Sequence, residues 1–342
     1  MNAASVQNPT SISPQTLVIS SHAKLNLFLD VFGKKADGYH EIETLFERIS
    51  LSDTLYLTEI ASDEVIIFSQ NRDIPSDQTN LAAQAARLIK DSLGISKGVK
   101  IEIEKNIPVG AGLAGGSSNG ASVLLGLNKL FGLHLNKKTL LSYANRLGSD
   151  VAFFVFNKKF AVGRGRGGEL ESVSVPKNVI LWHILFVPHA KILTKDVDQL
   201  LDQEIWRFPK SKSLKLTRWT GEKQGKKDPL SASALSKVSY TKMLTKKVHD
   251  VNILLSLLKS QNIGLLNRHI YNRLSETVMK SYRFVSELKS DLMKSGLKHV
   301  HMSGSGPALF TTFKQKQEAE RLYSALKDRF LDRCRVFLVS TQ

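Results

Sequence analysis

The sequence of 342 residues contains a single cysteine, Cys334, so the chain has no partner for an internal disulfide. One free cysteine suits a reducing compartment, and such a residue is most often a small, buried, apolar side chain. No apolar run approaches the roughly 18 uninterrupted residues that a membrane helix requires. The first fifteen residues are polar and lack the charged-then-apolar pattern of an export signal. These absences predict a cytoplasmic protein without a membrane partner.

Acidic residues are also scarce relative to basic ones. The formal net charge is +17, and segment 207–247 alone holds twelve Lys and Arg against two acids. A positive field attracts anionic ligands such as nucleotides. Trp206, Phe208 and Trp219 lie among these lysines, a pattern that nucleic-acid-binding proteins also use. A solvated surface insertion is the simpler interpretation, and it is the one favoured here.

The apolar content of 42% suffices for packed cores, and the length favours two domains. Alternating apolar residues at 24–32 predict a half-buried strand, and a helical stripe at 81–93 follows a possible cap, Asn80. The same patterns predict strands at 54–60, 64–68, 99–105, 160–162, 170–175, 179–187, 299–302, 308–313 and 335–338, and helices at 121–130, 137–147, 248–258, 284–294 and 317–327.

This mixture of elements predicts an α+β fold. A domain boundary is expected near residue 190, because Pro188 and the basic stretch interrupt the packed pattern. The predicted divisions are a polar tail at 1–19, a first domain at 20–190 and a second domain at 191–342. The second domain carries the basic insertion at about 205–247.

A glycine–serine run follows the strand predicted at 99–105. It comprises Pro108, Val109, Gly110, Ala111, Gly112, Leu113, Ala114, Gly115, Gly116, Ser117 and Ser118. Glycines permit positive φ and let a ligand approach backbone N–H groups closely. Ser117 or Ser118 is expected to cap the following helix, whose positive dipole end favours an anion. The run therefore predicts a phosphate-binding loop and an ATP-dependent small-molecule kinase.

Two other nucleotide motifs fit this loop less well. Gly110, Gly112 and Gly115 satisfy the dinucleotide fingerprint G-x-G-x-x-G, which also requires an acid about 20 residues further on. Residues 120–149 contain no Asp or Glu at all. The P-loop pattern needs a lysine after its second glycine, and none is present here. Both alternatives are therefore disfavoured.

The loop resembles that of the GHMP kinase superfamily. The superfamily signature P-x-x-x-G-L-x-S-S-A is approached by Pro108, Gly112, Leu113, Ser117 and Ser118. The extra glycines of the loop, together with segments 23–27, 36–40, 147–154 and 302–307, resemble one branch of the superfamily. The resemblance covers about 20–190 and 265–340. It implies an N-terminal α/β domain with a ribosomal-protein-like βαβ core, and a C-terminal ferredoxin-like α+β domain.

That branch phosphorylates the 2-hydroxyl of 4-diphosphocytidyl-2-C-methyl-D-erythritol with ATP, in the non-mevalonate route to isoprenoid precursors. The resemblance thus implies a small-molecule substrate that carries cytidine diphosphate. Alternatives are another GHMP kinase, of the homoserine or mevalonate type, and a nucleic-acid-binding protein. The Tyr39-His40 pair argues against the first, because those kinases need no cytosine clamp. Nucleic-acid binding leaves Lys24, Asp150 and the glycine loop unexplained. The oligomeric state is not predicted.

The resemblance also assigns roles to residues outside the loop. Asp150 is expected to be the general base, with Lys24 facing it and the attacking hydroxyl. A nearby ammonium keeps a carboxylate ionised and stabilises the developing alkoxide. Asn26 shares the strand face of Lys24 and is expected to bind the substrate. Lys105 and Asn80 stand at positions that resemble the adenosine pocket.

Tyr39 and His40 are expected to hold the cytosine, the first by stacking and the second by bonding an edge. The second aromatic that the family often uses is missing from 192–198, which leaves Trp206 or one-sided stacking as alternatives. The segment Asn272-Arg273-Leu274-Ser275 departs from the family's N-D-L-E. ATP chemistry implies Mg²⁺, and Ser117 is the candidate ligand on the protein side.

Overall fold

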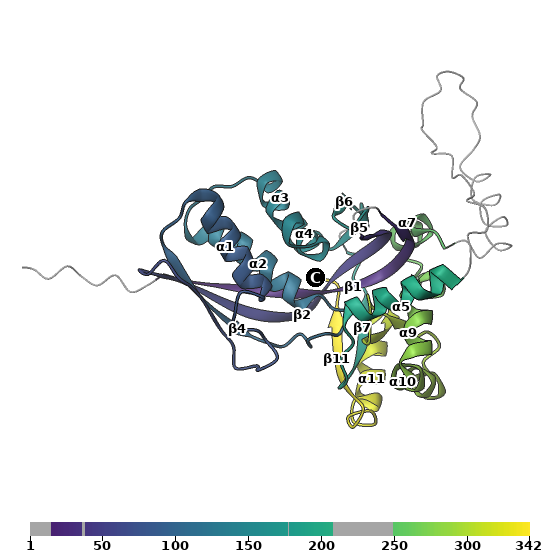
Figure 1. The fold of residues 1–342 in the computed structure, drawn as a ribbon. Helices are drawn as coiled ribbons and strands as arrows, with labels where there is room; N and C mark the ends of the chain where they lie inside the picture. Colours follow the sequence, from purple (N-terminus) through teal and green to yellow (C-terminus); the bar gives the residue numbers. More distant parts are fainter. Residues whose placement is uncertain (1–14, 36–37, 177, 208–248) are drawn as a thin grey trace, which may run out of the picture.

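The computed structural model describes residues 15–35, 38–176, 178–207 and 249–342 (Figure 1). The basic segment 207–247 therefore lies, apart from its first residue, outside the described residues. The described chain folds into two β-sheets with helices packed against them, which confirms the predicted α+β class.

The first sheet is built around a long antiparallel hairpin. β1 (Thr16–Lys34) pairs with β2 (His40–Ile60) over nearly its whole length. The sheet order is β3-β4-β2-β1-β8, and β5 and β6 extend it from β2. The remaining strands are β3 (Val65–Phe68), β4 (Gly98–Glu104), β5 (Phe160–Arg164), β6 (Glu169–Ser172) and β8 (Tyr271–Asn272).

The second sheet has four antiparallel strands in the order β11-β7-β10-β9. They are β7 (Trp182–Pro188), β9 (His301–Met302), β10 (Leu309–Phe313) and β11 (Cys334–Ser340). Strand β7 precedes the boundary expected near residue 190 but pairs with strands from the end of the chain. Cys334 is buried at the start of β11, and burial raises the pKa of its thiol to about 11. It behaves as the predicted apolar filler.

Four helices cover one face of the first sheet (Figure 1). They are α1 (Leu81–Leu93), α2 (Gly115–Leu130), α3 (Lys137–Leu147) and α4 (Ser149–Phe156). The remaining helices are α5 (Thr194–Arg207), α7 (Val251–Lys259), α8 (Ile263–His269), α9 (Leu274–Ser281), α10 (Arg283–Lys294) and α11 (Lys316–Leu326). Within the described residues, no helix has both the length and the apolar character that crossing a membrane would require.

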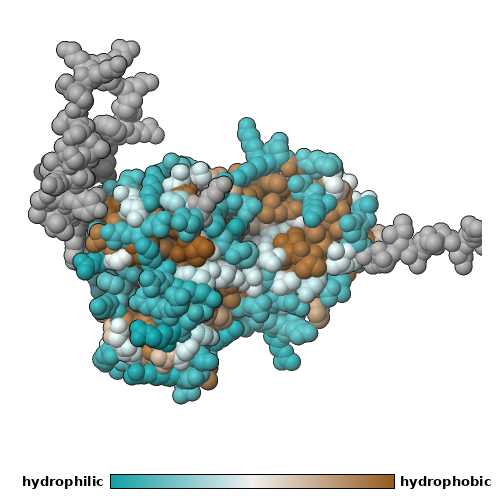
Figure 2. Space-filling model, turned by 180° about the vertical axis from the view of Figure 1, so that it is seen from behind, coloured by the Kyte–Doolittle hydropathy of each residue, from teal (hydrophilic) through white to brown (hydrophobic). Residues whose placement is uncertain are grey.

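The opposite face of the first sheet is partly open to solvent. Cross-strand pairing places Val18, Tyr56, Glu102 and Phe68 in one row, and Val18 and Phe68 are exposed. Figure 2 shows the side of the molecule away from the view of Figure 1, where apolar side chains form separate patches among hydrophilic ones. Paired strand residues point to the same face of a sheet. The helices α1 to α4 therefore cover only one side of this sheet.

Strand β1 was expected to be half-buried, but its central part is buried on both faces. Leu25 and Leu27 pack into a core that they share with Leu185 and Val187 of β7. Lys24 and Asn26 alternate with these leucines and point the other way, yet they are also buried. Polar side chains buried on the second face of a strand require partners. Those partners form the candidate site.

Candidate active site

A cavity of about 860 Å³ lies where β1, the loop before α2, the start of α4 and the start of α5 meet. The turn between β9 and β10 also contributes to its wall. All but two of the predicted site residues line it, namely Lys24, Asn26, Tyr39, His40, Asn80, Lys105, Pro108, Val109, Gly110, Ala111, Gly112, Ala114, Gly115, Gly116, Ser117 and Asp150. The other two, Leu113 and Ser118, are buried.

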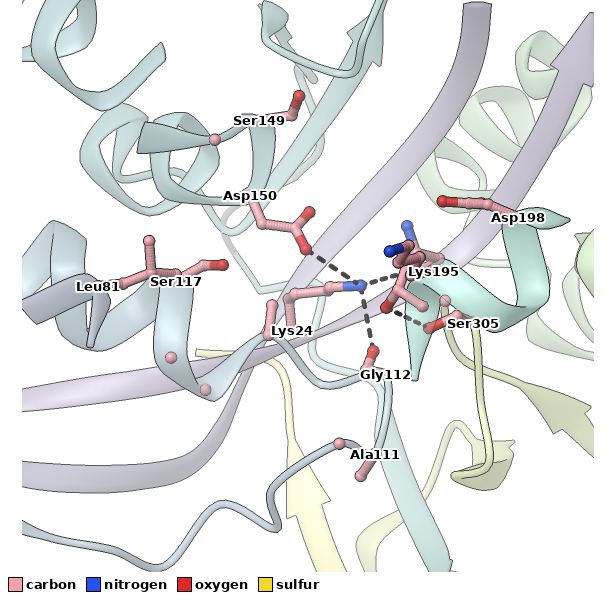
Figure 3. Close-up of a pocket in the computed structure, with 18 of the residues that line it drawn as sticks. Lys24, Leu81, Ala111, Gly112, Ser117, Ser149, Asp150, Lys195, Asp198 and Ser305 are labelled. Carbon is pink, nitrogen blue, oxygen red and sulfur yellow. Dashed lines mark hydrogen bonds and ion pairs between the residues drawn. The ribbon is translucent and has the colours of Figure 1, made fainter. Parts of the chain in front are cut away.

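The side chain of Lys24 on β1 lies at the centre of this cavity (Figure 3). Its ammonium donates to Oδ1 of Asn26 at 2.6 Å and to the carbonyl oxygen of Gly112 at 3.1 Å. The same Nζ lies 3.9 Å from Oδ2 of Asp150. A strand, a loop and a helix therefore meet at one ammonium group.

Burial dominates the electrostatics of Lys24, whose exposed fraction is 3%. Removal from water disfavours the charged form of an amine, so burial lowers the pKa of Lys24, and the Asp150 carboxylate opposes this shift. The Asp150 side chain is 36% exposed and faces the cavity. The pair thus combines a buried cation with a carboxylate that a ligand can reach.

Asp150 lies in the first turn of α4. The preceding helix, α3, ends at Leu147, and the new helix starts after Gly148. The partial positive charge at a helix start favours a carboxylate there. Next to it, the Ser149 hydroxyl donates to the carbonyl oxygen of Arg166, which ties α4 to the turn between β5 and β6.

The glycine–serine loop passes repeatedly through left-handed backbone conformations. The φ angles of Gly110, Gly112 and Ala114 are 68°, 75° and 56°. Backbone N–H groups in such turns form concave sites that bind anions. α2 begins at Gly115 rather than at 121, and its N-cap, Ala114, makes no side-chain cap bond. The predicted cap by Ser117 or Ser118 is therefore wrong, because both residues lie inside the helix.

The loop is locked against the turn that links β9 and β10. A Cβ at Gly112 would lie 2.2 Å from the carbonyl oxygen of Ser303, so only glycine fits there. The Ser303 hydroxyl donates to the Gly112 carbonyl at 3.1 Å, and Ala308 N donates to the Ala111 carbonyl at 3.2 Å. The side-chain amide of Asn272 donates to the carbonyl oxygens of Met302 and Gly304 and so stabilises the β9–β10 turn. Two glycine turns far apart in sequence thus shape one wall.

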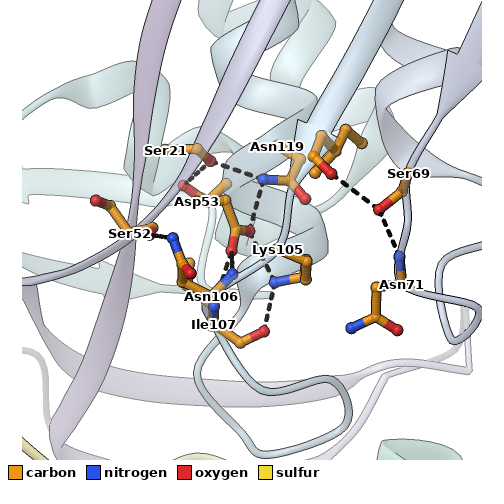
Figure 4. Close-up of polar contacts among 11 residues, drawn as sticks. Ser21, Ser52, Asp53, Ser69, Asn71, Lys105, Asn106, Ile107 and Asn119 are labelled. Atoms are coloured by element: carbon orange, nitrogen blue, oxygen red, sulfur yellow. Dashed lines mark hydrogen bonds and ion pairs between the residues drawn. The ribbon is translucent and has the colours of Figure 1, made fainter.

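A fully buried carboxylate, Asp53, anchors the start of the loop (Figure 4). Its Oδ1 accepts hydrogen bonds from the backbone N–H groups of Asn106 and Ile107, each at 2.8 Å. Its Oδ2 accepts from Lys105 Nζ at 2.7 Å and from Asn119 Nδ2 at 2.9 Å. Asp53 therefore joins the end of β4, the loop entrance and α2.

The two residues predicted near the adenosine pocket both have structural partners. The Lys105 side chain is only 2% exposed and pairs with Asp53. Burial lowers the pKa of Lys105, and the Asp53 carboxylate opposes that shift. Asn80 caps α1, since its Oδ1 accepts from Ala82 N and its Nδ2 donates to the Pro75 carbonyl. The cap that the sequence suggested at Asn80 is confirmed.

The far end of the cavity carries an aromatic ring. Tyr39 is 57% exposed, and the guanidinium carbon of Arg166 lies 3.7 Å from its ring centroid. The neighbouring His40 bonds through Nε2 to Oδ1 of Asp202 on α5, at 2.8 Å. Trp206, considered as a second aromatic, belongs to α5, but its side chain lies outside the described part of the chain.

Comparison with known proteins decides the family. The family model described as "GHMP kinases N terminal domain" matches residues 80–158. The model described as "GHMP kinases C terminal" matches residues 254–332. Relatives from Bacillus cereus (strain B4264) and Bacillus anthracis, each named 4-diphosphocytidyl-2-C-methyl-D-erythritol kinase, are 36% identical over 311 residues. These matches cover 91% of this chain and 93% of each relative. The chain belongs to the GHMP kinase family.

Solved structures agree with this assignment. A crystal structure of 4-(cytidine 5'-diphospho)-2C-methyl-D-erythritol kinase is 28% identical to this GHMP kinase, with a TM-score of 0.67. The match covers 95% of this chain and 98% of that one. A homoserine kinase from Cytophaga hutchinsonii also has a TM-score of 0.67, at 18% identity, and covers 98% of this chain. The second likeness shows the shared fold alone. The family resemblance, the two-domain fold and the ATP-dependent kinase activity predicted from the motifs are confirmed.

Sequence reasoning missed several polar residues of this GHMP kinase site, among them Asp53, Arg166 and Asp202. Asp53, Arg166 and Asp202 lie in the middle of β2, in a turn between short strands and within α5. None belongs to a glycine-rich motif. A signal existed for Asp53 alone, since an acid at the edge of the strand predicted at 54–60 requires a buried partner or solvent.

Proposed function

We propose that this GHMP kinase transfers the γ-phosphate of ATP to the 2-hydroxyl of 4-diphosphocytidyl-2-C-methyl-D-erythritol. One observation carries the proposal: the Lys24–Asp150 pair and the Tyr39-His40 pair line the same cavity. A substrate that has a cytosine at one end and an alcohol at the other needs both pairs. The names of the relatives that match nearly the whole chain support the same substrate.

Asp150 is proposed to accept the proton of the attacking hydroxyl. Its carboxylate faces the cavity, and the Lys24 ammonium lies 3.9 Å from it. As the proton leaves, negative charge develops on the substrate oxygen, and the same ammonium stabilises it. The bonds from Lys24 to Asn26 and Gly112 fix the ammonium before substrate binds, so little reorganisation accompanies the reaction.

The loop 108–116 and the start of α2 are proposed to hold the ATP phosphates. The left-handed turns at Gly110, Gly112 and Ala114 favour anion binding, and the α2 dipole adds to their effect. Lys105 adds positive charge behind the loop, although Asp53 offsets part of it. The side-chain amide of Asn80 is used to cap α1. The proposed contribution of Asn80 to the adenosine pocket is therefore to shape the pocket wall.

Mg²⁺ is proposed to enter with ATP. Within the described residues no cluster of three or more His, Cys, Asp or Glu side chains could hold a metal. A kinase can bind Mg²⁺ through one or two protein oxygens and the substrate phosphates. The Ser117 hydroxyl faces the cavity and is an oxygen donor of the kind that Mg²⁺ prefers (Figure 3). The ion would neutralise charge on the transferred phosphoryl group.

The substrate assignment is tested by ADP release. Purified enzyme is supplied with ATP, Mg²⁺ and one alcohol at a time: the cytidine-diphosphate-linked methylerythritol, mevalonate, homoserine or galactose. The first should give the highest kcat/KM. A preference for any of the other three would replace the proposed substrate while leaving the family unchanged.

Tyr39→Ala is expected to raise KM for the cytidine-linked substrate and to leave kcat nearly unchanged. Loss of aromatic stacking on a base costs about 1–3 kcal/mol, or roughly 5- to 150-fold in affinity. Steady-state kinetics with saturating ATP measure the effect. Tyr39→Phe keeps the ring and should behave like the wild type. An unchanged KM in Tyr39→Ala would remove the ring from the base site.

A further inference from the structure

The side chain of Asp202 joins two residues of the β1–β2 hairpin to α5. Its Oδ1 lies 2.8 Å from Nε2 of His40, and its Oδ2 lies 2.6 Å from Nζ of Lys34. The His40 side chain is 12% exposed and the Asp202 side chain 24%, and all three residues line the cavity. Both carboxylate oxygens are therefore used, one by each partner.

These contacts determine which nitrogen carries the proton when the His40 imidazole is neutral. Hydrogen bonds from Lys34 and then from His40 lower the pKa of Asp202, although partial burial opposes them. An ionised carboxylate can only accept hydrogen bonds, so Nε2 of His40 must be the donor. A neutral imidazole carries one N–H, which leaves Nδ1 with a lone pair.

We propose that Asp202 is a positioning residue that fixes this tautomer of His40 and so makes the site select cytosine over uracil. The inference rests on the proposed function, because it takes His40 to face the base of the substrate. Cytosine presents an amino group at C4, which donates to an acceptor. Uracil presents a carbonyl oxygen at the same place, and its lone pairs would face the lone pair of Nδ1.

A second carboxylate near His40 provides a control. Asp198 lies one helical turn before Asp202 and lines the same cavity (Figure 3). Burial raises the pKa of Asp198, and the nearby His40 and Lys34 oppose this while Asp202 adds to it. In the described residues, the carboxylate that accepts the hydrogen bond of the His40 ring is Asp202, not Asp198. Asp198 therefore contributes charge without setting the tautomer.

The decisive variant is Asp202→Asn. The Lys34 ammonium needs an acceptor, so the new amide oxygen should face Lys34 and the amide NH₂ should face His40. Nε2 must then accept, and the proton moves to Nδ1. A donor at Nδ1 suits the carbonyl of uracil and opposes the amino group of cytosine.

The test measures binding of cytidine diphosphate and uridine diphosphate by calorimetry at pH 8, with the ATP site filled by a non-hydrolysable ATP analogue. The wild type should prefer cytidine diphosphate. In Asp202→Asn the ratio of the two affinities should fall by about ten- to a hundred-fold, the range expected for a reversed hydrogen bond. Asp198→Asn should keep the wild-type ratio. Ring ¹⁵N shifts of His40 should show the proton moving from Nε2 to Nδ1 only in Asp202→Asn.

The proposal would be overturned by no preference in the wild type, by an unchanged ratio in Asp202→Asn, or by an equal loss in Asp198→Asn. A ratio that falls without a change of tautomer would also overturn it, because Asp202 would then act by charge alone. Failure of the proposed function is separate. It would appear as lack of turnover of the cytidine-linked alcohol by the wild type.

Discussion

Asp150→Asn is expected to lower kcat by at least about 10²- to 10⁴-fold, the usual contribution of a general base. The amide keeps the shape of the side chain but cannot take a proton from the substrate hydroxyl. It also leaves Lys24 without the carboxylate at 3.9 Å that offsets the effect of burial. ATP affinity should be nearly unchanged, because the loop at 108–116 is intact. Single-turnover phosphoryl transfer and calorimetric ATP binding measure the two effects.

Asp73→Asn is the matched control for that variant. Asp73 also lines the cavity, but its carboxylate pairs with Lys191 rather than with Lys24. The Asp73→Asn variant should keep kcat within a few-fold of the wild type. A kcat for Asp150→Asn within tenfold of the wild type would exclude Asp150 as the base. A simultaneous loss of ATP binding would instead point to a damaged site.

Asp53→Ala is expected to destabilise the protein by about 3–5 kcal/mol, the cost of breaking a buried ion pair by removing one partner. Asp53 is fully buried, and the change strands the Lys105 ammonium together with the N–H groups of Asn106 and Ile107. ATP affinity should fall as well, because the loop loses its anchor. Urea unfolding followed by circular dichroism gives the free energy of unfolding.

Glu320→Ala is the control that tests whether burial of the ion pair causes the loss of stability expected in Asp53→Ala. Glu320 forms an ion pair with Lys316 one turn away on α11, and both side chains are exposed. Exposed pairs of this type contribute about 0.3–0.5 kcal/mol, so this variant should unfold almost like the wild type. If Asp53→Ala lost less than about 1 kcal/mol, water or a rearranged Lys105 would have to replace the carboxylate.

Local patterns predicted much of the fold. Apolar stripes with clear ends located α1 and α3 with the bounds that the structure has. The predictions failed where tertiary contacts decide. α4 is short and apolar on nearly every side, so it has no polar face from which a helical period could be read. α5 is polar overall and helical because it packs Val197 and Leu201 into the core that Ile184 and Phe186 of β7 also form.

The same division applies to the site. The glycine loop, Lys24 and Asp150 belong to short motifs, and these motifs predicted them as site residues. The contacts of Asp53 with Lys105 and of Asp202 with His40 join residues 52 and 162 positions apart. The periodicity of a single sequence does not predict contacts between residues so far apart in the chain. The cap expected at Ser117 or Ser118 failed because α2 already begins at Gly115, directly after Ala114, which adopts the left-handed conformation expected of glycine.

The lock between Gly112 and Ser303 has a consequence for synthesis of the protein on the ribosome. Lys24, the glycine loop and Asp150 all emerge in the first half of the chain, whereas the turn that fixes the Gly112 carbonyl is made 191 positions after Gly112. A nascent chain that stops short of residue 303 would carry every proposed catalytic group without the contact that holds one partner of Lys24. Phosphoryl transfer should therefore begin only when translation is nearly finished.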